Sequence, residues 1–97
     1  MEKFRYNGKN YRTVATMGVL RTFRELTGYD ISELAQKRDS TAPAAFLWAA
    51  ITTASRIDGA EFGVSFDEFC DRVDIKECNA WFLTNFVEAP GESDKKK

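Results

Sequence analysis

Four acidic residues close together in the chain come nearest to a metal site by type and spacing. Carboxylate oxygens are the ligands that Ca²⁺ and Mg²⁺ prefer in proteins. On a helix, however, these four positions lie opposite the apolar residues of the same segment, and the ligand spacing of a calcium loop is absent. We therefore expect surface carboxylates that serve helix capping and solubility, and we expect no bound metal. The four residues are Asp67, Glu68, Asp71 and Asp74.

Catalytic chemistry finds little support in the remaining residues. The chain contains no histidine, which removes the usual general base near neutral pH and the commonest metal ligand. Its glycines form neither a dinucleotide fingerprint nor a Walker loop. Cys70 and Cys78 both fall on the apolar face of an expected helix, which is typical of buried, reduced thiols. The sequence therefore predicts a protein that is not an enzyme and uses no cofactor.

The N-terminal segment has the pattern of a β-hairpin. The dipeptide Asn7-Gly8 tolerates the positive φ angles of a two-residue type I′ turn, and short strand-like runs flank it. This register places Phe4 opposite Tyr11 on one face. An isolated hairpin is only marginally stable in water, so it is expected either to pack that face on the helices or to extend through the strand edge of a neighbouring copy.

Signals for the start and the end of helices follow the hairpin. The stretch Met17–Leu34 contains one amphipathic helix, a left-handed stop at Gly28, and a second helix capped by Asp30 with Glu33 in a capping box. A long central helix is expected to begin near Pro43 and to end near Gly59. Its apolar stripe is Phe46, Leu47, Ala50, Ile51, Ala54 and Ile57.

Two further capping signals precede the last helices. Ser65 and Glu68 form one capping box, and Asp74 with Glu77 repeats the signal before a final helix that runs to Val87. We therefore expect a mainly α fold, a small helical domain of about four to five helices with an N-terminal β-hairpin. Residues 1–87 form one globular domain and residues 88–97 a flexible polar tail. The polar N-terminus and the lack of a long apolar run favour a cytoplasmic protein.

Aromatic residues on two helices are the candidates for partner binding. In the final helix, apolar positions cover most of the circumference, which is wider burial than one small core supplies. Burial between the hairpin and the central helix is the alternative for these residues. Trp48, beside the stripe of the central helix, either binds a partner or is covered by its own chain. The candidates are Trp48, Trp81, Phe82 and Phe86.

Charge is distributed unevenly along the chain, although the formal net charge is only -1. Basic side chains dominate residues 1–24, whereas acidic ones dominate residues 25–94. If this asymmetry survives folding, the molecule is electrically two-ended, and the basic end meets either nucleic acid or the acidic flank of another copy. A solvated surface without a partner is the other alternative. The candidates for self-association or phosphate contact are Lys3, Arg5, Arg12, Arg21 and Arg24.

The order of these motifs resembles that of the tail assembly chaperones of long-tailed bacteriophages. In that family, an N-terminal hairpin leads into a helix that ends in Thr-Gly or Lys-Gly, then an aromatic residue or Asn, and then a short Leu-containing helix. The matching stretches here are MGVLRTFRELTGYDISEL at 17–34, FLWAAITTASRIDG at 46–59 and SFDEFCDRVD at 65–74. The resemblance extends over residues 3–87.

This resemblance implies a chaperone that coats the tape-measure protein and keeps its hydrophobic helices soluble. It further implies self-assembly into a homo-oligomer, a frameshifted longer form that recruits the tail tube protein, and release before the virion is complete. The alternative function is a small nucleic-acid-binding or regulatory domain that uses the basic hairpin and first helix. Acidic side chains on the later helices make nucleic acid the less favoured partner.

Overall fold

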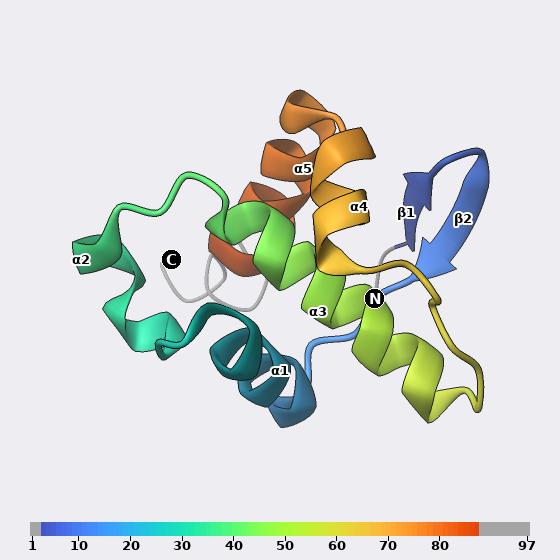
Figure 1. The fold of residues 1–97 in the computed structure, drawn as a ribbon, viewed down its shortest axis with the longest axis horizontal. Helices are drawn as coiled ribbons and strands as arrows, with labels where there is room; N and C mark the ends of the chain where they lie inside the picture. Colours follow the sequence, from blue (N-terminus) through green and yellow to red (C-terminus); the bar gives the residue numbers. More distant parts are fainter. Residues whose placement is uncertain (1–2, 88–97) are drawn as a thin grey trace, which may run out of the picture.

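The structure is a computed structural model that describes residues 3–87 (Figure 1). Within this range the chain is mainly helical, with five helices behind an N-terminal antiparallel hairpin, so the predicted fold class is confirmed. A short 3-10 turn (η1) precedes α2, and a π-helical turn (η2) extends α5. The elements are β1 (Lys3–Tyr6), β2 (Lys9–Arg12), α1 (Met17–Thr27), η1 (Ile31–Glu33), α2 (Leu34–Lys37), α3 (Ala42–Ile57), α4 (Phe66–Arg72), α5 (Ile75–Phe82) and η2 (Leu83–Val87).

The hairpin has the predicted turn and register. Asn7 and Gly8 have φ angles of 52° and 82°, as a type I′ turn requires, and Phe4 pairs with Tyr11. Phe4 and Tyr6 are buried, while Lys3 and Arg5, which alternate with them, are exposed. The hairpin therefore packs through one face, as the alternation of its side chains predicts.

The first helix ends where the glycine predicts. Gly28 adopts a left-handed conformation with φ 86°, and its N–H donates to the carbonyl of Arg24 at 2.8 Å. Asp30 caps the next element, but its side chain accepts from the backbone N–H of Ser32 at 2.9 Å. The expected second helix consequently starts as the 3-10 turn η1 before α2 continues it.

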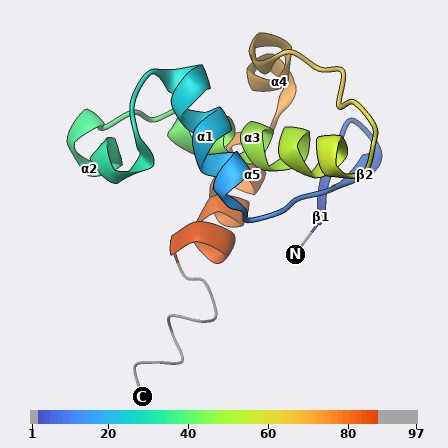
Figure 2. The same cartoon turned by 90° about the horizontal axis from the view of Figure 1, so that it is seen from below.

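The central helix α3 lies between the other elements, as both views show (Figures 1 and 2). Five members of the predicted stripe are buried: Phe46, Leu47, Ala50, Ile51 and Ala54. Ile57, the sixth, is 58% exposed, so its predicted burial is wrong. Ile57 is the last residue of α3, and the helix extends there past α1 and α4 (Figure 1).

Both capping signals of the C-terminal half are confirmed. The Ser65 hydroxyl accepts from the N–H of Glu68 at 3.1 Å, and the Asp74 carboxylate accepts from the N–H of Glu77 at 3.0 Å. The expected flexible tail, residues 88–97, lies outside the described residues. Within residues 3–87, no helix has both the length and the apolar character needed to cross a bilayer.

Two aromatic clusters occupy different regions of the core. One joins the hairpin to α4 and to the loop before it, with ring centroids 4.8 to 6.3 Å apart; its members are Tyr6, Tyr11, Phe62 and Phe69. The other gathers around Phe46 and consists of Phe23, Phe46, Trp81, Phe82 and Phe86. The first cluster packs the hairpin against α4 and the loop before it, and the second packs α5 against α1 and α3.

Candidate partner-binding surfaces

An apolar groove lies where the start of α1 meets the end of α5. It encloses about 390 Å³, within the range of about 300–1,000 Å³ that is usual for ligand pockets. We call it the α1–α5 groove. Its lining residues are Val14, Ala15, Thr16, Met17, Val19, Leu20, Phe46, Trp81, Asn85 and Phe86.

The π-helical turn builds one wall of this groove. In the turn, the Asn85 side-chain amide donates to the carbonyl of Trp81 at 3.0 Å, and the Phe86 ring lies 4.7 Å from the ring of Phe46. The Phe86 ring also stacks on Phe82, with centroids 5.0 Å apart. Phe86 is half-buried, so it keeps part of its surface at the groove, as a partner-binding residue requires.

Trp81 and Phe82 are less available than the helical pattern suggests. They are only 6% and 8% exposed, because α5 packs these rings against Phe46 on α3. Of the two alternatives for these rings, burial is the one observed, and the central helix α3 covers them; Trp81 still contributes to the lining of the α1–α5 groove. A wheel projection counts the apolar positions of a helix, but it does not say which neighbours cover them.

Besides Ile57, the large exposed apolar side chains lie on residues that were not among the partner-binding candidates. Met17 is 77% exposed at the rim of the α1–α5 groove, and Ile75 and Leu83 on the last helical segment are 76% and 47% exposed. Met17 stands at the first position of α1, before its apolar stripe begins. An apolar residue that precedes the stripe has no stripe position to bury it, and this placement could have identified Met17 as exposed from the sequence.

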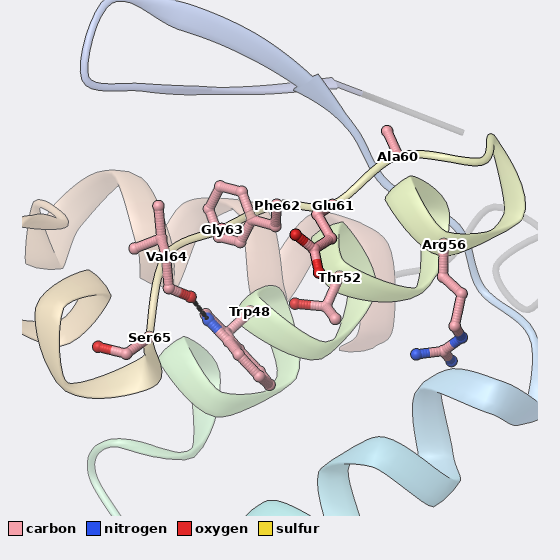
Figure 3. Close-up of a pocket in the computed structure, with 9 residues that line it drawn as sticks. All are labelled: Trp48, Thr52, Arg56, Ala60, Glu61, Phe62, Gly63, Val64 and Ser65. Atoms are coloured by element: carbon pink, nitrogen blue, oxygen red, sulfur yellow. Dashed lines mark hydrogen bonds between the residues drawn. The ribbon is translucent and has the colours of Figure 1, made fainter.

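Trp48 forms the wall of a second recess, drawn in Figure 3. Its indole N–H donates to the carbonyl of Val64 at 2.8 Å, and its ring meets Phe66 edge-on at 6.1 Å. Trp48 is half-buried, so its own chain covers one part and a surface recess the other. We call this recess the Trp48 pocket; it encloses about 560 Å³ between α3 and the loop before α4.

The basic candidates do not form one patch. Arg12 binds Asp58 through two contacts of 2.7 and 3.1 Å; the hydrogen bond raises the pKa of the guanidinium and lowers the pKa of the carboxylate. Lys3 and Arg5 lie on the exposed face of β1. Arg21 and Arg24 lie on α1, away from the hairpin in both views (Figures 1 and 2), and Arg24 is 3.8 Å from Asp30.

The acidic and basic surfaces are also neighbours. The Tyr6 ring of the basic hairpin lies 4.9 Å from Phe69 of the acidic helix α4. Burial raises the pKa of Tyr6, and the nearby Glu68 carboxylate raises it further. Aromatic packing therefore brings the acidic helix α4 to the inner face of the basic hairpin, so these two segments of opposite charge lie side by side.

The acidic residues lie on the surface, as the sequence predicts, whereas only one of the two thiols is fully buried. Asp67, Glu68, Asp71 and Asp74 are exposed, and residues 3–87 contain no cluster of three or more acidic or thiol ligands suited to a metal. Cys78 is buried, which raises the pKa of its thiol to about 11, and half-buried Cys70 has a pKa raised by the same cause. Both thiols are thus protonated near neutral pH.

The two recesses differ in chemical character. The α1–α5 groove offers apolar contact, while the Trp48 pocket combines an aromatic wall with polar groups. The two recesses are lined by different residues, so each can be tested by itself.

A search for relatives found that no family model, no curated protein and no solved structure matches this chain.

Proposed function

We propose that this protein is a phage tail assembly chaperone that binds the tape-measure protein, keeps it soluble and promotes tail tube assembly. The observation that carries the proposal is the α1–α5 groove with Met17 exposed at its rim. The order of hairpin, helix, Thr-Gly stop and short helix, which resembles that family, supports it. On this proposal the protein is not an enzyme and works in the host cytoplasm.

The shape and lining of the groove suit an amphipathic helix. Such a helix places its apolar side chains at every third or fourth position into a hydrophobic groove of its partner. Apolar side chains from the β2–α1 connection, α1, α3 and the π-helical turn converge here. Met17 adds a flexible, polarizable thioether, which adapts to side chains of different shape. A chaperone needs that tolerance, because it binds many segments of one long client.

Basic side chains beside the groove favour a client that carries acidic residues. Arg21 and Arg24 are exposed on α1 and border a shallow surface that also includes Met17 and Leu20. An apolar helix with acidic residues along its edge would therefore be favoured, and its binding should weaken in salt. Several copies along one client would gain further from multivalency, and the tail tube protein is the next partner that the proposal implies.

A nucleic-acid-binding function is less favoured by this geometry. Its phosphate contacts would have to come from two separate elements, the hairpin with Lys3 and Arg5 and the helix α1 with Arg21 and Arg24. Arg12 is already paired with Asp58. A compact basic face, which gives most nucleic-acid-binding domains their affinity, is not formed by these five residues.

The test is co-expression with an apolar helical segment of the tape-measure protein. Met17→Glu places a charge at the groove, whereas Ile57→Glu places the same charge on an exposed apolar residue at the far end of α3. We expect Met17→Glu to lower the soluble yield of the client and to weaken its affinity about tenfold or more. Ile57→Glu should leave both unchanged. Equal effects of the two variants, or a client that is equally soluble without the protein, would contradict the proposal.

A further inference from the structure

The tip of the hairpin presents an asparagine followed by a glycine to solvent. Asn7 and Gly8 join β1 to β2 at the upper right edge of the molecule in Figure 1. Both residues are exposed, and a Cβ added to Gly8 would meet no other atom within 4 Å. Among residues 3–87, no acceptor engages the Gly8 N–H and no partner engages the Asn7 side-chain amide. The two groups are therefore free to react with each other.

An asparagine followed by a glycine can lose its side-chain amide without an enzyme. The Gly8 backbone nitrogen gives up its proton and attacks Cγ of Asn7, so that a nitrogen–carbon bond forms while the Cγ–Nδ2 bond breaks. Ammonia leaves with the amide nitrogen and that proton, and a five-membered succinimide ring remains. Water then opens the ring at either of its two carbonyl groups. One opening gives aspartate at position 7, and the other gives isoaspartate, in which the main chain runs through Cγ.

The surroundings of the turn favour this reaction. Gly8 has no side chain to hinder the approach of its nitrogen to Cγ. The approach also requires rotation of the Asn7 backbone, and an exposed turn with few contacts opens locally at little cost in free energy. Arg5 and Lys9 flank the turn with exposed cationic side chains. Positive charge stabilises both the deprotonated nitrogen and the carboxylate that forms.

The chain contains a second dipeptide of this kind, Asp58-Gly59, which its contacts protect. An aspartate closes the same ring with loss of water, and it does so most readily when its carboxyl group is protonated. Both carboxylate oxygens of Asp58 bind Arg12, at 2.7 and 3.1 Å, and this hydrogen bonding lowers the pKa of Asp58. The Gly59 N–H donates to the carbonyl of Arg56 at 3.1 Å. The structure thus leaves only the hairpin dipeptide free within residues 3–87.

We propose that Asn7 is a site of spontaneous deamidation in the folded protein, and that its isoaspartate product loosens the hairpin. Isoaspartate adds one carbon to the main chain of a turn that sets the strand register. That register pairs Phe4 with Tyr11, and the Tyr6 ring packs 4.9 Å from Phe69. The aspartate product keeps the main chain intact, and Asp-Gly also forms type I′ turns. No hairpin residue lines the α1–α5 groove, so the inference does not depend on the client proposed above.

The test follows the full chain during incubation at neutral and at mildly alkaline pH. Peptide mapping by mass spectrometry locates the mass gain from exchanging the amide NH2 for OH, and methylation by an isoaspartate-specific methyltransferase measures the isoaspartate. We expect Asn7 to convert at least about tenfold faster than Asn10, Asn79 and Asn85, which do not precede glycine. The rate in the folded protein should lie within about tenfold of the rate in urea, because the turn opens locally.

Matched variants separate the reaction from its effect on the hairpin. Asn7→Gly removes the amide and leaves Gly-Gly, which also forms type I′ turns, so its melting temperature should not change during the incubation. Wild-type protein that has accumulated isoaspartate should melt about 4 °C or more below the fresh protein. Freshly prepared Asn7→Asp carries the charge of the product without the extra main-chain carbon. It should melt close to the fresh wild type.

Three results would overturn the inference. The first is an Asn7 that keeps its amide in the folded protein while the chain in urea converts, because the turn would then protect it. The second is conversion of Asp58 or Asn10 as fast as that of Asn7, because the free turn would then not select the site. The third is an unchanged melting temperature after isoaspartate has accumulated, because the turn would then not determine how the hairpin packs.

Discussion

Phe46→Ala is the substitution from which we expect the largest loss of stability. The Phe46 side chain is 6% exposed, and its ring lies 6.1 Å from Phe23 on α1, 6.0 Å from Trp81 on α5 and 4.7 Å from Phe86. Truncating a buried Phe costs about 3–5 kcal/mol, depending on how far the surroundings collapse. Three elements meet at this ring, so filling the cavity would require a helix to move. We therefore expect about 4–5 kcal/mol.

That loss is a large fraction of the total free energy of unfolding. A chain of this size is stabilised by roughly 5–15 kcal/mol, and each kcal/mol shifts the melting temperature of such a domain by about 4–8 °C. Phe46→Ala should accordingly lower the melting temperature by about 20 °C or more. The free energy of unfolding is measured by urea denaturation followed by circular dichroism, with Phe46→Leu as an intermediate variant that should cost about 1–1.5 kcal/mol.

The control is Phe66→Ala, which removes the same ring from a half-buried position at the start of α4. Phe66 contacts Trp48 edge-on at 6.1 Å, so its loss should cost about 1–1.5 kcal/mol. Equal losses for Phe46→Ala and Phe66→Ala would refute the view that Phe46 joins α1, α3 and α5. A much smaller loss for Phe46→Leu than for Phe46→Ala would identify the cavity as the main cost.

Further predictions concern a turn, a hydrogen bond and two titrating groups. Gly28→Ala, at φ 86°, should cost about 1–2 kcal/mol in urea denaturation. Trp48→Phe should cost about 1 kcal/mol, because the carbonyl that its N–H binds at 2.8 Å loses its donor. Hydrogen bonds lower the pKa of Asp39, so its carboxylate stabilises the fold above a pH of about 4. Asp39→Asn should therefore have a smaller free energy of unfolding than the wild type at pH 7. The difference between the two proteins should disappear as the pH falls through the pKa of Asp39 in the folded state. Burial and the hydrogen bond to Asp39 raise the pKa of Tyr29 to about 12. The absorbance change from its ionisation should therefore lie near pH 12 and be absent in Tyr29→Phe. The contribution of the neutral Tyr29 side chain to the free energy of unfolding should be lost between about pH 10 and 12.

Local signals in the sequence were sufficient for the elements of the fold. The turn at Asn7-Gly8, the stop at Gly28 and the caps at Ser65 and Asp74 each depend on a few neighbouring residues, and all four are formed as predicted. The same locality explains the deviation at Asp30, where a 3-10 turn replaces the first turn of the expected helix. Capping patterns specify where a helix starts, but they do not distinguish the first turn of an α-helix from a 3-10 turn.

The candidate surfaces depend on contacts between distant segments, which a single helix does not reveal. Trp81 and Phe82 lie on a helix that is apolar on most sides, and Phe46, which covers them, is more than thirty residues earlier. Once α3 covers those two rings, the α1–α5 groove keeps accessible apolar surface on Phe86 of the π-helical turn and on Met17 at the start of α1. The α1–α5 groove therefore exists only in the folded domain. We expect any substitution that detaches α5 from α3 to remove client binding together with stability, whereas Met17→Glu should separate the two.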